Sequence, residues 1–323
     1  MGRFAAAVDE TFAPLLLELG FAYVGSQVDD DRATATFHMA DHELTLRYRP
    51  PESSDLGRIE VTADGEPLRG VLGSRSERDR VGDPAATDLR AMPDPARSNP
   101  HATRSEATDP ERGDAFRASV HDAVDRLRRL LPPHLHAEFV RRHHPTEGGV
   151  VVVPPQPFWP RVSLDEAARI APCFEPRQAR VEPIGSTSVP GLQAKPIIDL
   201  LIEAENIAAV DAASSSIVQL GYEAMGEYGL PGRRYFRREL EPGVRLYHVH
   251  AFERGSEGAI RHLAFRDYLR AHREVAAEYG ALKCRLADRH SSDVEAYMDG
   301  KNAFIQKAEQ DAVAWWRSMD PSR

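Results

Sequence analysis

The sequence predicts an α+β protein of two domains, and three observations support this prediction. Its 323 residues exceed the usual length of one domain. Short stretches rich in β-branched and aromatic residues alternate with stretches of helical periodicity. A proline-rich stretch separates the two parts. We expect a small α+β domain formed by residues 1–73 and 113–145, a disordered tether at 74–112, and a domain at 150–318 that combines a sheet with helices.

Composition and charge exclude several classes of protein. Hydrophobic residues make up 41% and charged residues 28% of the chain, which is typical of a packed globular protein. No apolar run approaches the roughly 18–20 residues of a membrane-spanning helix, and Asp9 and Glu10 interrupt the start before a secretory apolar segment forms. The net charge of −9 disfavours duplex nucleic acid as a partner. Because Cys173 and Cys284 are too few for a disulfide framework, we expect a cytoplasmic protein without membrane association.

The N-terminal domain begins with an amphipathic helix over residues 2–22, which Gly20 closes. Four strands are predicted next, at Tyr23–Ser26, Thr34–Met39, Glu43–Tyr48 and Arg58–Val61. A second helix around Val120, Val124 and Leu127 should stop at Pro132-Pro133. We expect the histidines after it to lie on a solvated helix end and not to bind a metal: His134, His136, His143 and His144.

The tether between the two halves of this domain is predicted from its composition. Residues 74–112 hold five prolines and no aromatic residue, and their seven arginines nearly balance eight acids. Such a segment buries too little apolar surface to offset the entropy of ordering. We therefore expect residues 74–112 to be disordered and dispensable for folding.

The second domain is predicted from a series of strands followed by helices. Ser163 and Glu166 have the spacing of a capping box, which predicts a helix from Ser163 to about Phe174. Strands are expected at Ala179–Ile184, Pro196–Ile202, Tyr235–Glu239 and Arg245–Phe252. Helices are expected at Ile207–Leu220, Gly258–Ala271, Arg273–Arg289 and Val294–Trp316. Together these elements predict an α+β domain.

The most informative stretch runs from Val181 to Ile202. It predicts a strand that ends at Gly185, a short polar turn, and a second strand that carries Asp199. Glycine at a strand end lets a ligand approach the backbone, and the turn residues supply hydroxyl and amide donors that suit a phosphate or another anion: Ser186, Thr187 and Ser188. Asp199 lies in an apolar run, where a carboxylate is costly unless a metal or a donor accepts it. The alternative is a structural aspartate that caps the backbone or pairs with Lys195.

Two strings resemble the signature of the GrpB family in the nucleotidyltransferase superfamily: Ile-Gly-Ser-Thr-Ser-Val-Pro-Gly-Leu from Ile184, and Ala-Lys-Pro-Ile-Ile-Asp up to Asp199. The similarity continues through later blocks and covers roughly residues 150–318: Arg234–Phe236, His248–His250, His262–Arg270, Tyr279–Lys283 and Tyr297 with Lys301 and Phe304. The resemblance implies a nucleotidyltransferase-like mixed sheet with helices. Members of the family also occur fused to dephospho-CoA kinase.

The superfamily pattern implies a Gly-Ser pair and two carboxylates at alternate strand positions, which hold Mg²⁺ against the phosphates of a nucleotide. Gly185, Ser186 and Asp199 match this pattern, whereas Leu201 occupies the position of the second carboxylate. Glu203 shares the face but lies about 7 Å further along the strand, too far to share a metal. Two-metal transfer is therefore disfavoured, and a single metal, a histidine-assisted reaction or binding alone stay open.

His248 and His250 lie two residues apart on a predicted strand, so both rings face the same side. They either ligate a metal with Asp199, His250 being our metal candidate, or act as a general base near neutral pH. One of them alternatively is a core histidine. We name Asp199, His248 and His250 as candidate catalytic residues.

Basic residues are predicted to face the bound phosphates: Lys195, Arg234, Arg266, Arg270, Lys283 and Lys301. Arg234 belongs to an arginine cluster on a strand, of which at most half can line one site because alternate residues face opposite sides. Lys283 and Lys301 each follow a tyrosine by four residues at the edge of an apolar stripe. Such lysines either extend to water or point inward to an anion.

These observations lead to two hypotheses of function. The first is a nucleotidyltransferase-like enzyme that binds a nucleoside triphosphate with Mg²⁺ and acts on a small-molecule acceptor. The alternative is a catalytically silent nucleotide-binding or regulatory module, whose N-terminal domain recognises a protein partner. Mg²⁺ should sharpen nucleotide-induced thermal stabilisation if the first holds.

Overall fold

A computed structural model describes residues 2–28, 32–39, 42–49, 58–63, 66–67, 110–145 and 149–319. The chain divides into two compact units, Met1–Leu131 and Pro132–Arg323. Most of the predicted tether, residues 74–109, lies outside the described residues. Its last three residues, Pro110 to Arg112, form the first turn of a helix, so the predicted boundary at 112 is wrong by this margin.

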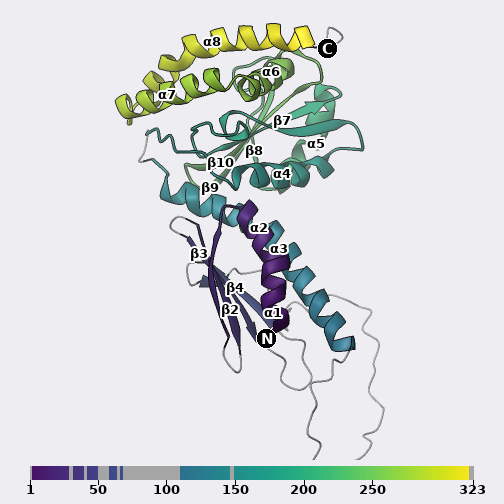
Figure 1. Ribbon diagram of the computed structural model, residues 1–323. Helices are drawn as coiled ribbons and strands as arrows, with labels where there is room; N and C mark the ends of the chain where they lie inside the picture. Colours follow the sequence, from purple (N-terminus) through teal and green to yellow (C-terminus); the bar gives the residue numbers. More distant parts are fainter. Residues whose placement is uncertain are drawn as a thin grey trace, which may run out of the picture. The chain divides into compact units, whose positions relative to one another are not determined.

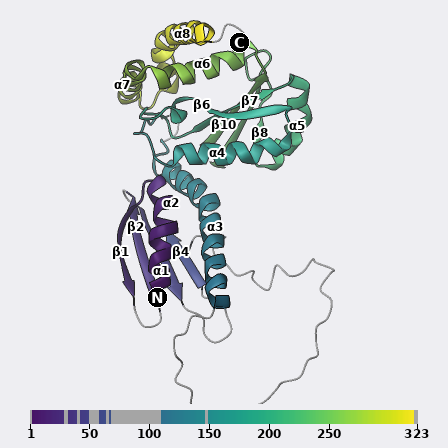
Figure 2. The same cartoon turned by 45° about the vertical axis from the view of Figure 1, so that its right-hand side comes forward.

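The first unit is a five-stranded antiparallel sheet with helices on one face (Figures 1 and 2). The helical start consists of α1 (Gly2–Ala7), the π-helical turn η1 (Val8–Phe12) and α2 (Ala13–Glu18). The strands follow in sheet order as β1 (Ala22–Val28), β2 (Ala33–Met39), β3 (His42–Arg49), β4 (Arg58–Ala63) and β5 (Glu66–Pro67). The predicted helix and four strands are confirmed, because their apolar periodicity is buried: Phe4, Val8, Phe12, Leu15 and Phe37 are each under 5% exposed.

Helix α3 (Pro110–Arg142) corrects the predicted stop at Pro132-Pro133, because both prolines lie inside it. Each internal proline removes a backbone hydrogen bond at a cost of about 3 kcal/mol. Apolar side chains are buried on both sides of the prolines, from Leu127 and Leu131 to Leu135 and Val140. Burial of these side chains offsets that cost and lets the helix continue.

One histidine of this helix is not on a solvated surface, contrary to prediction. His136 is fully buried, lies 3.3 Å from the Leu246 carbonyl through Nε2, and packs edge-on against Tyr247. Burial lowers the pKa of His136 to about 4, although the bond to the carbonyl opposes the shift. His136 is therefore a neutral core residue of the second unit.

The second unit contains a five-stranded mixed sheet with strand order β6-β7-β10-β9-β8. Its strands are β6 (Ala179–Ile184), β7 (Ile198–Ala204), β8 (Glu223–Ala224), β9 (Arg234–Glu241) and β10 (Val244–Glu253). Strands β7 and β10 run parallel, and the other neighbours are antiparallel. The four predicted strands are confirmed, and the two-residue strand β8 was not predicted because it is too short to show a pattern.

Helices cover both faces of this sheet (Figure 1). They are α4 (Trp159–Ile170), α5 (Ile207–Gln219), α6 (Glu257–Ala271), α7 (Arg273–Arg289) and α8 (Val294–Met319), with the short 3-10 turns η3 (Ala171–Cys173) and η4 (Ser186–Ser188). Asn206 caps α5 and Ser256 caps α6, each by accepting a hydrogen bond from the backbone N–H three residues on. In both views α6, α7 and α8 lie on one side of the sheet, and α4 and α5 lie on the other (Figures 1 and 2).

The predicted capping box at Ser163 is wrong, because α4 begins one turn earlier with Pro160 in its first turn. Ser163 lies inside the helix and donates to the Pro160 carbonyl at 2.9 Å. Glu166 is 5% exposed and accepts hydrogen bonds from Tyr222, Arg169 and Arg238. Glu166 is thus part of the core on the α4 side of the sheet.

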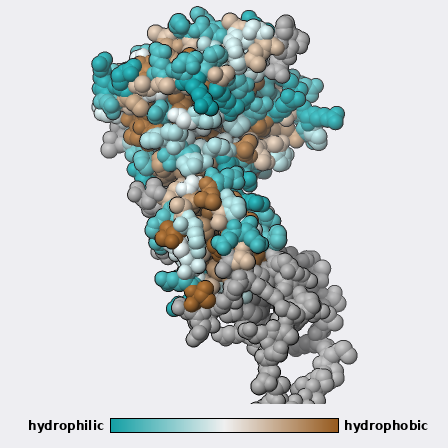
Figure 3. All heavy atoms as spheres, viewed as in Figure 1, coloured by the Kyte–Doolittle hydropathy of each residue, from teal (hydrophilic) through white to brown (hydrophobic). Residues whose placement is uncertain are grey.

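The described helices include none that is long and apolar enough to cross a membrane. On the face drawn in Figure 3, hydrophilic residues predominate on the second unit, with isolated hydrophobic ones among them. Scattered exposed apolar side chains are normal for a folded surface.

Candidate functional site

The turn after β6 is shaped by the close approach of its glycine to Asp199. Gly185 has φ +69°, a region that L side chains rarely adopt, and a Cβ there would lie 2.5 Å from Asp199 Oδ2. The next residues form η4, in which Ser188 Oγ donates to the Gly185 carbonyl at 2.7 Å. Thr187, the middle residue of this turn, is buried. The absence of a side chain at 185 therefore lets the turn pack directly on the carboxylate.

Asp199 lies near the start of β7, next to the parallel strand β10, and faces His248 in the register of the two strands. Its Oδ1 is 3.3 Å from His248 Nδ1, and 28% of its side chain is exposed, so a ligand in solution can reach it. Burial alone raises the pKa of Asp199, but the bond to His248 and the charges of His248, His250 and Lys195 lower it overall. Asp199 is therefore ionised, and its predicted pairing with Lys195 is electrostatic without an ion-pair contact.

Three histidines near Asp199 have buried ring nitrogens without a partner among the described residues: His248 Nε2, His250 Nδ1 and His262 Nε2. His250 lies between the rings of Tyr235 and His262, at 5.3 and 5.0 Å between centroids. Burial lowers the pKa of His250 to about 4 and that of His262 to about 3, so both are neutral at pH 7. Burying an unpaired nitrogen is costly, so each of these rings has a nitrogen that can form a hydrogen bond with water or a polar ligand.

Three lysines surround the same turn and carboxylate. Lys283 of α7 is 3% exposed, lies 2.7 Å from Ser186 Oγ and donates to the Gln193 carbonyl. The ammonium groups of Lys195 and Lys301 lie over the ring of Tyr297, at 5.8 and 5.2 Å from its centroid. Among the described residues, no carboxylate is within ion-pair distance of any of the three. Lys283 therefore points inward, which settles one of the alternatives left open by the sequence.

Burial makes these lysines easier to deprotonate. Burial, followed by repulsion from Lys301, lowers the pKa of Lys283 to about 7. Burial, followed by repulsion from Lys195, lowers the pKa of Lys301 to about 8. Burial also lowers the pKa of Lys195, against the attraction of Asp199. Cations that lack a protein counter-charge are expected to bind an anion more tightly than paired ones.

We call this group the Asp199 cluster; it comprises Gly185, Ser186, Lys195, Asp199, His248, His250, Lys283 and Lys301. It lies at the end of the sheet where β6 stops and β7 starts, on the side covered by α6 to α8. Tyr279 belongs beside it, because its ring lies 4.3 Å below the Lys283 ammonium.

The structure does not bring the three predicted arginines into the cluster. Arg234 occupies the opposite face of the sheet and forms a bidentate pair with Asp211 of α5, so it does not face the cluster as we expected. Arg266 directs its donors to Glu182, Asp267 and the Pro183 carbonyl. Arg270 donates two hydrogen bonds to the Ser188 carbonyl and thereby stabilises the turn.

The residue at the position of the second carboxylate, Leu201, belongs to the hydrophobic core. Leu201 is fully buried and packs with Ile184, Phe252 and Leu263. Glu203 is also buried, and burial, followed by repulsion from Glu182, raises its pKa. The described part of the chain contains no group of three or more histidine, cysteine, aspartate or glutamate side chains arranged to hold a metal. A metal here would depend on Asp199 and on ligands that arrive with a substrate.

Three neighbours of the cluster were not among the predicted site residues: Tyr235, Tyr279 and Gln193. Tyr235 packs against both His248 and His250, and the pKa of its phenol is raised to about 12, first by burial and then by Asp199. The ring of Tyr279 also stacks on that of Phe304, at 5.1 Å between centroids. The spacing of four between Tyr279 and Lys283, a predicted site residue, was the signal that could also have placed Tyr279 at the site.

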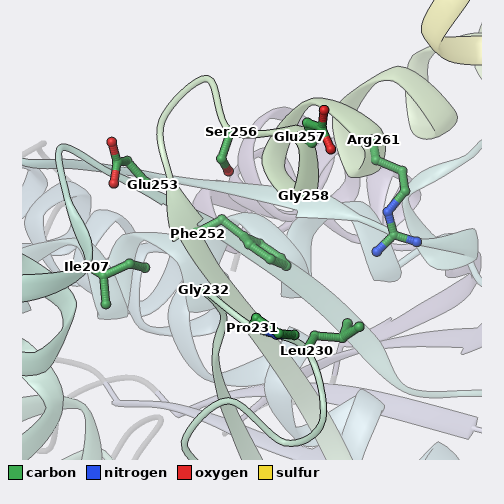
Figure 4. Close-up of a pocket in the computed structure, with 10 residues that line it drawn as sticks. All are labelled: Ile207, Leu230, Pro231, Gly232, Phe252, Glu253, Ser256, Glu257, Gly258 and Arg261. Atoms are coloured by element: carbon green, nitrogen blue, oxygen red, sulfur yellow. The ribbon is translucent and has the colours of Figure 1, made fainter.

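A separate groove of about 570 Å³ lies at the start of α6 (Figure 4). In that view the ring of Phe252 lies between the loop of Leu230 and Pro231 and the start of α6, and Arg261 lies at one side. Glu253 and Glu257 also line this groove, so it does not offer the cationic surface that a phosphate requires. The Asp199 cluster offers that surface.

Comparisons with known proteins agree with the motifs of this unit. The family model described as GrpB protein matches residues 149–311. The UPF0157 protein YqkA of Bacillus subtilis is 42% identical over 157 residues, which cover 49% of this chain and 45% of that protein. The glutamate-rich protein GrpB of Alkalihalophilus pseudofirmus is 27% identical over 164 residues, covering 50% of this chain and 94% of that one. A crystal structure of the conserved protein GrpB from Enterococcus faecalis shares 42% identity and a TM-score of 0.48, covering 51% of this chain and 99% of that chain.

The second unit is thus a mixed α+β domain with a polar cluster at the end of its sheet. The chain belongs to the GrpB family. It spans less than half of the length of the Bacillus subtilis relative, and the family match does not extend to the first unit.

Proposed function

We propose that this protein binds a nucleoside triphosphate with Mg²⁺ at the Asp199 cluster and transfers part of it to a small-molecule acceptor. The single observation that supports this most is the set of three lysines around the Gly185 turn. Lys195, Lys283 and Lys301 face one carboxylate, Asp199, and no second acid balances them among the described residues. A polyanionic ligand supplies the missing negative charge.

The turn is suited to hold the phosphates of such a ligand. Gly185 allows close approach to the backbone, and Ser186 adds a hydroxyl next to the Lys283 ammonium. Arg270 holds the turn in place through the Ser188 carbonyl. These contacts would position the phosphates before any chemistry occurs.

Mg²⁺ prefers oxygen ligands, such as the Asp199 carboxylate, to the nitrogen ligands that histidines offer. Mg²⁺ is commonly held by one or two carboxylates together with substrate phosphates and water. Asp199 is ionised and partly exposed, and Leu201 removes any second carboxylate, so the metal would arrive with the nucleotide. When bound, it would neutralise charge on the phosphates. His250 lies further along the strand beside His262 and is a poor ligand type for this metal.

His248 is the residue best placed to accept a proton from the acceptor. Its Nδ1 lies 3.3 Å from Asp199 Oδ1, which fixes the ring, and its buried Nε2 has no partner among the described residues. A carboxylate that orients a histidine in this way leaves the other nitrogen to act as a base.

A second function, a silent nucleotide-binding or regulatory module, is favoured by one observation. Leu201 is packed in the core at the position of the second carboxylate, so the two-metal arrangement of active transferases is absent there. In such a protein the cluster binds nucleotide without turnover, and the first unit recognises a protein partner.

Thermal unfolding in the presence of phosphate compounds tests the proposal. The four nucleoside triphosphates, pyrophosphate and phosphate are each added with and without Mg²⁺, and a ligand at 100 times its Kd should add about 2.7 kcal/mol of stability. We expect at least one triphosphate to raise Tm with Mg²⁺, Lys301→Met to reduce the shift, and Arg234→Gln, on the opposite face, to retain it. Absence of a shift with every compound would exclude phosphate binding. A shift without product formation from any acceptor would favour the silent module.

A further inference from the structure

One contact in the cluster joins a hydroxyl and an amine that are distant in sequence. Ser186 is the first residue of η4 and Lys283 lies 97 residues later in α7, yet Ser186 Oγ and Lys283 Nζ are 2.7 Å apart. This is a normal hydrogen-bond distance for the two groups. The contact therefore pairs a potential nucleophile with a potential base.

The surroundings of Lys283 disfavour a permanent ammonium. Its side chain is 3% exposed, and the described acids include none within ion-pair distance of it. Lys301 repels its charge, while Asp199, Cys284 and the ring of Tyr279 attract it. Burial has the largest effect and leaves the pKa of Lys283 at about 7, so a neutral amine is available at physiological pH.

A neutral amine can keep both contacts of Lys283 Nζ, which in the structure donates to Ser186 Oγ and to the Gln193 carbonyl. It has two N–H donors and one lone pair, and the Gln193 carbonyl accepts one of the donors. The lone pair is then free to accept the hydroxyl proton of Ser186. Gly185 at φ +69° holds Ser186 at the end of β6, next to Asp199.

We propose that Ser186 and Lys283 form a serine–lysine nucleophilic pair that attacks a phosphorus centre of the bound phosphoanhydride. Ser186 Oγ forms the new bond to phosphorus, the bond to the leaving phosphate oxygen breaks with its electron pair, and the hydroxyl proton moves to Lys283 Nζ. The acceptor hydroxyl then displaces Ser186, which recovers its proton from Lys283, and the acceptor proton moves to His248. The identity of the ligand rests on the proposed function, whereas the pair itself rests on the contact between Ser186 and Lys283.

A fluorophosphonate probe tests the pair without any nucleotide, because an activated serine displaces fluoride from its phosphorus. The full chain is treated with the probe, and labelled peptides are identified by mass spectrometry. We expect labelling at Ser186, with a rate that rises through an apparent midpoint near pH 7 as Lys283 loses its proton. Lys301→Met removes a repelling charge, so it should move this midpoint to higher pH and retain labelling above it.

Substitutions of Lys283 distinguish a side chain that accepts the proton of Ser186 from one that only supplies a positive charge. Ser186→Ala should abolish labelling, and Ser215→Ala, on the exposed part of α5, should leave it unchanged. Lys283→Met and Lys283→Arg should both slow labelling by at least about 100-fold, because neither side chain can take the proton. Equal labelling in Lys283→Arg would overturn the pair. If the lysine variants do not fold, the pH profile of the wild type and the loss in Ser186→Ala decide the question.

The outcome is separable from that of the proposed function. An unlabelled Ser186 in a protein that still gains Tm from a triphosphate would refute the pair and leave nucleotide binding intact. A labelled Ser186 in a protein that binds no phosphate compound would keep the pair and refute the nucleotide. Labelling at another serine with the same pH profile would also overturn the proposal.

Discussion

Gly185 and Asp199 are in such close contact that a single added carbon at position 185 would lie 2.5 Å from the Asp199 carboxylate oxygen. The contact joins the end of β6 to the start of β7, which are paired in the sheet through Ile184 and Asp199. The turn that carries Ser186 and the carboxylate are therefore positioned by one another.

The first prediction follows from this contact. Gly185→Ala should destabilise the protein by about 2 kcal/mol or more, because it adds a clash to a backbone with φ +69°. Gly191→Ala is the matched control, since Gly191 has φ +79° but a Cβ added there would have no neighbouring atom within 4 Å. Urea unfolding should show the larger loss at 185; equal losses would mean that contact with Asp199 has no role.

The charged form of Lys301 should lower the free energy of unfolding, because burial disfavours its charge. Its pKa is lowered to about 8 in the folded protein from 10.5, so the unfolded chain binds the proton more tightly and this lysine opposes folding fully below pH 8. Lys301→Met should therefore raise stability by about 1–3 kcal/mol at pH 7. The gain should shrink between pH 8 and 10.5 in denaturant titrations. A variant less stable than wild type at pH 7 would contradict the assigned burial.

The buried His136 should contribute to unfolding in acid. Its folded-state pKa of about 4 lies below the ordinary 6.5, so the unfolded chain gains a proton first as pH falls through this window. His136→Phe should remove this sensitivity and gain about 2 kcal/mol relative to wild type between pH 7.5 and pH 5. Parallel stability curves for the two proteins over this range would disprove the neutral core assignment.

Glu166 should be structural and independent of the site. It accepts bonds from Tyr222, Arg169 and Arg238 on the face of the sheet that α4 covers. Glu166→Gln should leave these arginines without their counter-charge and destabilise by about 3 kcal/mol. Although its Tm is lower, the variant should show the same nucleotide-induced shift in Tm as wild type. Loss of that shift would place Glu166 in the functional machinery.

The sequence predicted the elements of the fold well where buried residues recur with the period of a helix or a strand. Helix α7 has the predicted bounds, because its buried residues repeat with the period of a helix; strand β6 also has the predicted bounds, although only Ile184 in it is buried. The start of α4 was missed since Ser163 has the sequence of a cap, while its hydroxyl donates within the helix. The stop at Pro132 was missed because packing of α3 on both sides outweighs a local rule.

The sequence indicated which residue types form the candidate site, but not the direction in which each side chain points. The motif of the family located Gly185, Ser186 and Asp199 together, and strand alternation placed His248 and His250 on one face. Which face Arg234 takes depends on the register of β9 against β10, which sequence does not reveal. The inward direction of Lys283 depends on the packing of α7 against the turn.

The central claim, that Asp199 and its lysines bind a nucleoside triphosphate with Mg²⁺, is tested most directly by calorimetric titration of ATP. Titrations are made into wild type and Asp199→Asn, each with Mg²⁺ and with EDTA, after circular dichroism confirms that the variant is folded. We predict that wild type binds with Mg²⁺, that EDTA weakens binding at least about tenfold, or 1.4 kcal/mol, and that Asp199→Asn removes this dependence on the metal. Equal affinity in all four titrations, or no binding by wild type in either, would contradict the claim.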